Sequence, residues 1–196
     1  MGNTILRKKL FLILAFFMAL VVVVSNYLVQ FPFNYLGLAS VLTYGAFSYP
    51  VAFLITDLAN RKYGKFVAKK IVYFGFCFGV VLTFYFSKNF SDLISIRIAI
   101  GSGTAFIVAQ LIDVQIFDQL RKKKWFIAPL VSSLGGSTID TIIFFSIAFM
   151  GTETNWILLG FGDLSVKIIV AVFMLIPFRL FMKKIEDFSS SNLLYD

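Results

Sequence analysis

The residues of greatest chemical interest are charged and amide side chains that interrupt long apolar runs. Asp140 lies in the middle of one such run, shortly after the small residues of S-S-L-G-G-S-T at 132–138. A charge at mid-membrane costs roughly 2.5–3.5 kcal/mol on insertion scales, so chains seldom carry one without a polar interior to hold it. We therefore expect Asp140 to belong to a membrane-embedded site for a small polar solute. The alternative is a small-residue packing face on which Asp140 pairs with a neighbouring cation.

Four more polar side chains are expected at a similar depth, on three other apolar runs. Asp163 and Lys167 are four residues apart and would share a helix face, where they could simply neutralise each other. Arg97 could instead extend to the membrane interface, and Asn26 could hydrogen-bond between helices. Because four runs contribute, the sequence predicts one outward-facing cavity lined by Asn26, Arg97, Asp140, Asp163 and Lys167.

A second polar set is expected nearer the cytoplasm. Gln110 and Asp113 are three residues apart and share a helix face. Asp113 and Asp118 precede the basic run at 121–124, so an interfacial ion network is the expected environment for both. Gln110 lies deeper and is the better candidate for solute binding. Asp57, Asp113 and Asp163 are the rivals of Asp140 as the carboxylate that binds the solute.

The composition indicates a membrane protein. Of the 196 residues, 59% are hydrophobic and only 14% are charged, whereas soluble domains average about 25% charged. One span and a short loop take about 30 residues, which allows six spans. We predict an all-α, single-domain bundle over residues 1–185 and a flexible cytoplasmic tail at 186–196. The expected spans are 10–30, 36–59, 67–87, 94–120, 126–150 and 156–182.

The placement of basic residues predicts the orientation of the bundle. Most of the 18 lysines and arginines fall in four segments, at 7–9, 61–70, 121–124 and 179–184. With six spans, all four segments lie on one side, and the positive-inside rule makes that side cytoplasmic. We therefore expect a multi-pass protein of the inner (cytoplasmic) membrane with both termini in the cytoplasm. The same cations then serve as topology signals and lipid-headgroup partners, which removes the argument for nucleic-acid binding.

The sequence offers little for catalysis. It has no histidine and one cysteine, Cys77, so neither a cysteine-based metal motif nor a cysteine–histidine pair can form within one chain. A G-x-G at 101–103 lacks the third glycine and the preceding strand of a phosphate-binding motif, and we interpret it as helix packing. We expect no enzyme activity, no cofactor and no bound metal.

Several segments together resemble the bacterial queuosine-precursor transporters of the vitamin-uptake-transporter type. They cover residues 20–185 in the family's order, and they are specific only in combination. Where the family commonly has histidine in D-V-H-V-F, this chain has Gln115, which argues against an essential histidine there. The segments are S-N-Y-L-V-Q at 25–30, T-Y-G-A-F-S-Y-P at 43–50, F-L-I-T-D-L at 53–58, R-I-A at 97–99, A-Q-L-I-D-V-Q-I-F at 109–117, W-F-I-A-P at 125–129, S-T-I-D-T at 137–141 and F-F-S-I-A-F at 144–149.

The resemblance implies six helices, similarity to the substrate-binding subunits of energy-coupling-factor importers, and uptake of a queuosine precursor. That precursor would be 7-cyano-7-deazaguanine, 7-aminomethyl-7-deazaguanine or queuine. A deazaguanine presents a ring N–H beside an exocyclic amine, and one carboxylate can accept both bonds. Asp140 is the first choice for that carboxylate. An amide from Gln110 or Asn26 could bind the carbonyl side, and an aromatic ring could stack on the base.

Other functions stay open at this level. The polar groups could only hold helices together in a membrane assembly or scaffold protein. The chain could also take up another vitamin-like heterocycle as a subunit of an ATP-driven importer. The expected partners are the deazapurine and the lipid bilayer, with a homo-oligomer or an energising ATPase left open. The energy source is equally open between a proton carried by Asp140 or Asp163, facilitated transport and ATP.

Overall fold

The computed structural model describes residues 2–28, 31–35, 42–86 and 93–192. Within these ranges the fold is all-helical, as predicted, with one isolated β-bridge between Pro32 and Thr43. The six helices of this part of the chain are α1 (Gly2–Leu28), α2 (Gly45–Tyr63), α3 (Lys65–Phe86), α4 (Leu93–Leu120), α5 (Ile127–Phe149) and α6 (Trp156–Asn192).

Four of these helices, α1, α4, α5 and α6, are long and apolar enough to cross a membrane. Their outer faces expose large apolar side chains, among them Phe16, Phe161 and Phe173. Exposed apolar surface on this scale is unfavourable in water and typical of a surface that contacts lipid or a partner. The helix lengths and this surface together support a membrane bundle.

Helix α2 forms the centre of the bundle. It packs against each of the other five helices, and more than half of its residues are buried. Its mean hydropathy is low because it carries Asp57, Asn60, Arg61 and Lys62. Surrounding helices bury Asp57 and Asn60, whereas Arg61 and Lys62 are half-buried in the last turn of α2. Burial against other helices is how a polar helix can occupy the middle of an apolar bundle.

The sequence predicts that the second span begins at residue 36, and this is wrong because residues 42–44 are not helical. There the chain doubles back on itself, with Phe33 N–H donating to Leu42 O at 2.8 Å and Tyr44 N–H donating to Phe31 O at 3.1 Å. Helix α2 therefore begins only at Gly45, and it continues to Tyr63 instead of ending at 59. Residues 36–41 lie outside the described ranges.

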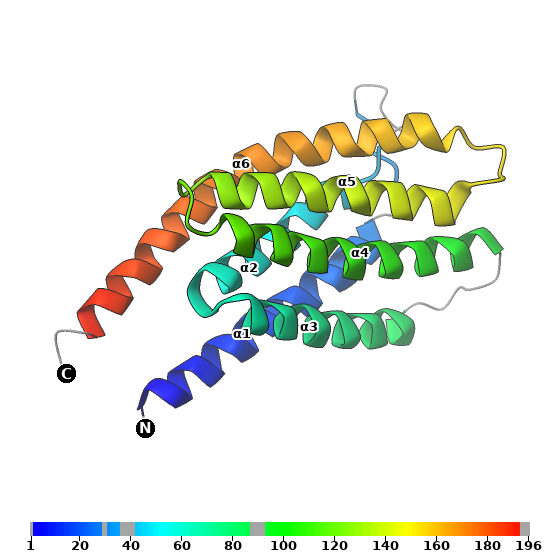
Figure 1. The fold of residues 1–196 in the computed structure, drawn as a ribbon. Coiled ribbons are helices and arrows are strands. Elements are labelled where there is room, and N and C mark those ends of the chain that lie inside the picture. Colours follow the sequence, from blue (N-terminus) through cyan, green and yellow to red (C-terminus); the bar gives the residue numbers. More distant parts are fainter. Residues whose placement is uncertain (1, 29–30, 36–41, 87–92, 193–196) are drawn as a thin grey trace.

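The sixth helix is longer than predicted. Figure 1 shows α6 changing direction in its C-terminal half, and the helix contains Pro177, a residue that commonly kinks helices. It then runs to Asn192, ten residues past the expected end at 182 and into the segment expected to be a flexible tail. The reason is local: K-K-I-E-D-F has neither proline nor glycine, and lysine and glutamate favour helix.

The basic segments share one end of the bundle. In Figure 1 the α2–α3 turn and the α4–α5 loop lie at the same end as both labelled termini, and the α5–α6 loop lies at the opposite end. The basic segments that the sequence predicts to lie on one side are therefore at one end of the helices. Pairs of helices approach closely at glycines. A Cβ on Gly101 of α4, for example, would lie 3.2 Å from Phe144 O on α5, as expected if the G-x-G serves packing.

Candidate functional site

A cavity lies between α2, α4, α5 and α6, next to residues 42–45. The cavity has a volume of about 90 Å³, below the roughly 300–1,000 Å³ usual for pockets that enclose a drug-sized ligand. Its walls are mostly apolar, with a few polar groups, the usual character of a small-molecule site. The lining includes Ala46, Tyr49, Ser102, Asp140, Phe144, Phe145, Asp163 and Lys167.

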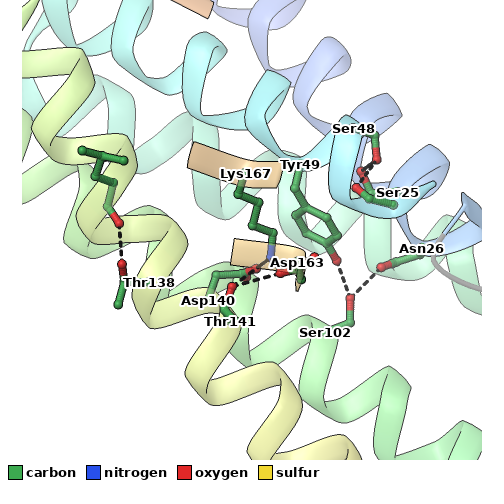
Figure 2. Close-up of polar contacts among 12 residues, drawn as sticks. Ser25, Asn26, Ser48, Tyr49, Ser102, Thr138, Asp140, Thr141, Asp163 and Lys167 are labelled. Carbon is green, nitrogen blue, oxygen red and sulfur yellow. Dashed lines mark hydrogen bonds and ion pairs between the residues drawn. The ribbon is translucent and has the colours of Figure 1, made fainter. Parts of the chain in front are cut away.

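The charged part of the cavity is a triad of two aspartates and one lysine. Lys167 Nζ donates to Asp140 Oδ2 on α5 at 2.7 Å and also pairs with Asp163, one turn earlier on α6. All three side chains are buried, with residue exposures of 4% for Asp140, 9% for Asp163 and 2% for Lys167. Figure 2 shows the lysine between the two carboxylates. Lys167 thus joins α5 to α6, and the triad has one more carboxylate than cation.

Both carboxylates retain an oxygen that can accept a further bond. Asp163 Oδ2 accepts a hydrogen bond from Thr141 Oγ1 at 2.9 Å, in addition to its ion pair with the lysine. Across the described residues, the hydrogen bonds to these aspartates all end on Oδ2, and neither Oδ1 is fully buried. Both residues line the cavity. The site therefore offers acceptor oxygens to a ligand that carries N–H donors.

Tyr49 forms the aromatic wall of the site. Lys167 Nζ lies 5.5 Å from the centroid of the Tyr49 ring, within the range of a cation–π contact. Tyr49 and Asp140 line the same cavity. A ring next to a carboxylate is the arrangement that binds a planar base by stacking and by edge hydrogen bonds at once.

A hydrogen-bond chain connects this wall to α1. Tyr49 Oη lies 2.6 Å from Ser102 Oγ, and Ser102 Oγ donates to Asn26 Oδ1 at 2.9 Å. Because the serine has only one hydroxyl proton, Tyr49 must donate to Ser102. Figure 2 shows this chain leading away from the triad. Asn26 is thus linked to the cavity through Ser102, although Asn26 itself does not line it.

Three residues of this site were missed from the sequence: Tyr49, Ser102 and Thr141. A tyrosine or hydroxyl residue in an apolar helix costs little to bury once it is hydrogen-bonded, so its type alone does not mark a site. The sequence signal that could have identified these residues is their position relative to the charged and amide candidates. Thr141 adjoins Asp140, and Ser102 is eight residues before Gln110, so it lies on the same helix face.

Arg97 lies apart from the cavity, contrary to prediction. Its Nε donates to Ile147 O at 2.9 Å and its Nη2 to Met150 O at 2.7 Å. The last carbonyls of a helix lack intrahelical donors and carry partial negative charge. A guanidinium at the C-terminal end of α5 satisfies both needs, which explains its position there.

Asp57, Gln110 and Asp113 form a separate cluster nearer the basic end of the helices. We call it the inner cluster, and we call the cavity at Asp140 the outer cavity. All three are buried, at 2%, 0% and 0% exposure, and none of them lines the outer cavity. Gln110 Oε1 accepts a hydrogen bond from Thr56 Oγ1 on α2 at 2.6 Å. These three residues are thus a second polar set, separate from the residues that line the cavity at Asp140.

Of the two aspartates predicted to lie in an interfacial ion network, Asp113 and Asp118, only Asp118 does so. Asp118 pairs with Arg121 at 3.9 Å, and both side chains are about one-third exposed. Asp113 takes part in no ion pair among the residues that the structure describes. It points inward, toward Asp57, because Asp113 lies on the buried face of α4 with Gln110, and Asp118 lies on the face that reaches the basic end.

The candidate metal ligands do not cluster. Within the described ranges, no group of three or more histidine, cysteine, aspartate or glutamate side chains is arranged to hold a metal ion. The residues that line the cavity at Asp140 offer hydrogen bonding, charge and aromatic stacking.

Comparison with known proteins agrees with a transport role. Residues 43–182 match the family model described as "Putative vitamin uptake transporter". The chain is 31% identical over 212 residues to the queuosine precursor transporter of Escherichia coli (strain K12), an alignment covering 96% of this chain and 95% of that protein. It is 34% identical over 200 residues to the probable queuosine precursor transporter of Haemophilus influenzae, covering 87% and 85% respectively.

A third relative is the probable queuosine precursor transporter of Bacillus subtilis (strain 168), 34% identical over 134 residues, which cover 56% of this chain and 57% of the relative. No solved structure matches the chain. The family model covers more than two-thirds of the chain, and the Escherichia coli relative aligns over nearly its full length. The chain is a member of the vitamin uptake transporter family and is related to the queuosine precursor transporters.

Proposed function

We propose that this protein imports a queuosine precursor into the cytoplasm and that the cavity at Asp140 is where the precursor binds. The observation that carries the proposal is the buried Asp140–Lys167–Asp163 triad beside a cavity with mostly apolar walls. Membership of a transporter family and the names of the relatives support the solute class.

The proposed recognition uses groups that are already positioned. Asp140 Oδ1 accepts the ring N–H and the exocyclic amine of the deazaguanine, a charge-assisted pair that is stronger than neutral hydrogen bonds. Tyr49 stacks on the ring system, which contributes about 1–3 kcal/mol per base in other proteins. Asp163 stays with Lys167 and Thr141 and holds the lysine in place.

This selectivity favours guanine-like edges. A base that presents an acceptor where a deazaguanine presents its N–H would place two acceptors against each other, and a site built for hydrogen bonds rejects such a ligand strongly. We include 7-cyano-7-deazaguanine, 7-aminomethyl-7-deazaguanine and queuine in the class, since all three share the guanine edge.

The proposed setting is the inner membrane, crossed six times, with both termini in the cytoplasm. Support comes from the six helices of the described ranges and from the gathering of the basic segments at the end that holds both termini. The positive-inside rule then makes that end cytoplasmic, so the cavity opens toward the opposite side. We extend the proposal to an arrangement like that of energy-coupling-factor binding subunits, acting alone, as a homo-oligomer or with an ATPase.

The test is uptake of labelled 7-cyano-7-deazaguanine by cells that cannot synthesise it. The wild-type chain should restore uptake, and Asp140→Asn should reduce it at least tenfold at equal membrane abundance. Asp118→Asn is the matched control, because that aspartate pairs with Arg121 near the basic end. Equal uptake by wild type and Asp140→Asn would show that the triad only holds helices together, as in a scaffold protein.

A further inference from the structure

The inner cluster contains two carboxyl groups that face each other without a cation. Asp57 on α2 and Asp113 on α4 both lie at the contact between these helices, where Thr56 Oγ1 donates to Gln110 Oε1 at 2.6 Å and Asn60 Nδ2 donates to Val114 O at 2.9 Å. Ser132 Oγ donates to Asp57 Oδ1 at 3.3 Å. No described lysine or arginine forms an ion pair with either aspartate. This contrasts with the outer triad, where Lys167 lies between the carboxylates.

The nearest cationic side chain toward the basic end is already engaged. Arg121 Nη2 donates to Asn60 Oδ1 at 3.2 Å, one helical turn beyond Asp57, and Arg121 also pairs with Asp118. Asp113 Oδ1 and Oδ2 are both buried and have no hydrogen-bond partner in the described part of the chain. Two ionised carboxylates near each other and away from water repel each other, and pairs of this kind hold one proton between them. The geometry therefore requires a positive charge that the protein does not supply.

Unpartnered polar groups lie next to this pair on two helices. Gln110, one turn outward from Asp113 on α4, is fully buried, and its Nε2 has no hydrogen-bond acceptor in the described part of the chain. Ser137, one turn outward from Ser133 on α5, is 1% exposed, and its Oγ likewise has no partner there. Buried donors are satisfied by protein or by ordered water in nearly all proteins, so these two point to a ligand or to water.

These groups lie on lines that connect the pair to the outer cavity. On α5, Ser133, Ser137 and Asp140 follow at helical spacing, and the distance from Ser133 to Asp140 along the axis is roughly 11 Å. On α4, Ser102 and Gln110 follow the same face. Phe53 of α2, buried at 3% exposure, lies between the two levels. The inner pair is thus close to the cavity but separated from it by an apolar layer.

We propose that Asp57 and Asp113 form a proton-binding site, distinct from the solute cavity, that couples inward movement of the solute to a proton gradient. This proposal rests on the proposed transport function. The proton enters from the outer side, passes along water held by Ser137 and Gln110, and is shared by the two carboxyl groups. It leaves toward the basic end when the pair opens to the cytoplasm, so each cycle moves the proton and the solute in the same direction.

The experiment uses the full chain reconstituted in lipid vesicles, with labelled 7-cyano-7-deazaguanine as the probe. An imposed pH gradient, alkaline inside, should drive accumulation above the external concentration in wild type. Asp113→Asn and Asp57→Asn each remove the shared proton and keep the size of the side chain, so either variant should reduce accumulation at least tenfold. Exchange of external label for internal unlabelled solute, which needs no net proton movement, should persist in both.

Asp118→Asn on the same helix is the control, and it should accumulate the solute as wild type does. Wild-type exchange without accumulation on a pH gradient, or accumulation driven by a sodium gradient instead, would overturn the coupling proposal and leave the transport function standing. Full accumulation by both amide variants would also overturn it. If wild type neither exchanges nor binds the base, the transport function itself fails, and the coupling proposal fails with it. The use of two variants from different helices protects the test against one that does not fold.

Discussion

Lys167 determines whether two carboxylates can stay charged inside the bundle. It contacts Asp140 and Asp163 and lies over the Tyr49 ring, with only 2% of its surface exposed. Removing one partner of a buried charge network leaves the others uncompensated, which typically costs about 3–5 kcal/mol. The lysine therefore contributes both to the stability of the α5–α6 contact and to the charge of the cavity.

Lys167→Met should lower the stability of the purified protein by about 3–5 kcal/mol, seen as a large drop in the temperature of thermal unfolding in detergent. Adding Asp163→Asn to this variant should recover part of the loss, because one uncompensated charge is removed. Lys183→Met, at an exposed position of the same helix, is the control and should unfold with the wild type. An unchanged unfolding temperature for Lys167→Met would mean that the triad contributes nothing to stability.

The charged residues of the outer site were predictable, and their partners were only partly so. Asp140, Asp163 and Lys167 are conspicuous because lipid disfavours their charges. The partners of Arg97 are backbone carbonyls at the end of α5, and such partners cannot be identified from residue types. The inward direction of Asp113 depends on how α4 is rotated against α2, and sequence spacing cannot fix that rotation.

At the scale of elements, the contact between α1 and α3 depends on two glycines one turn apart. A Cβ at Gly75 would lie 2.5 Å from Met18 Cγ and 3.2 Å from Ala15 O, and one at Gly79 would lie 2.8 Å from Val22 Cβ. Small residues at this spacing let membrane helices approach closely. The contact requires glycine on α3, because even one methyl group overlaps the side chains of α1.

Gly75→Ala should therefore destabilise the protein by about 1–3 kcal/mol, the usual range for overpacking. Gly103→Ala is the matched control on α4, where an added Cβ would meet Phe76 Cζ at an ordinary 3.6 Å. That variant should be neutral or stabilised by up to about 1 kcal/mol, because alanine is the better helix former. Thermal unfolding of both in the same detergent checks the contrast, and equal shifts would contradict the proposed packing.

The order and number of the helices in the described ranges followed from hydropathy, and the ends of three helices did not. Helix α1, for example, begins at Gly2, eight residues before the predicted start of the first span. Apolar runs predict the bodies of α4 and α5 well, because apolar side chains dominate their composition. The start of α2 depends on the bridge between Pro32 and Thr43, a contact that hydropathy does not predict. The end of α6 lies beyond the apolar run, where helix propensity continues the helix without apolar burial.

At the scale of the whole molecule, charge is distributed asymmetrically along the axis of the bundle. The basic segments lie at the end with both termini, and the α5–α6 loop at the other end carries Glu153 and no lysine or arginine. We propose that this asymmetry orients the bundle with its basic end in the cytoplasm, which would leave the cavity at Asp140 nearer the opposite side.

Single cysteines should reveal that orientation, once the native Cys77 has been replaced by alanine. In intact cells, an impermeant maleimide should label Glu153→Cys and should label Lys122→Cys only after the membrane is opened. The physical reason is that loops rich in lysine and arginine stay in the cytoplasm. The reverse labelling pattern would place the cavity on the cytoplasmic side. It would then contradict the proposal that the cavity takes up the solute from outside the cell.

The most direct test of the central claim is equilibrium binding of labelled 7-cyano-7-deazaguanine to the purified protein. Asp140→Asn converts one acceptor oxygen of the side chain into a donor and removes its charge, and a charged hydrogen bond contributes about 1.5–3 kcal/mol. We predict that Asp140→Asn weakens binding about 10- to 150-fold, whereas Asp118→Asn binds as the wild type does. Unchanged affinity in a folded Asp140→Asn variant would contradict the assignment of this cavity as the binding site.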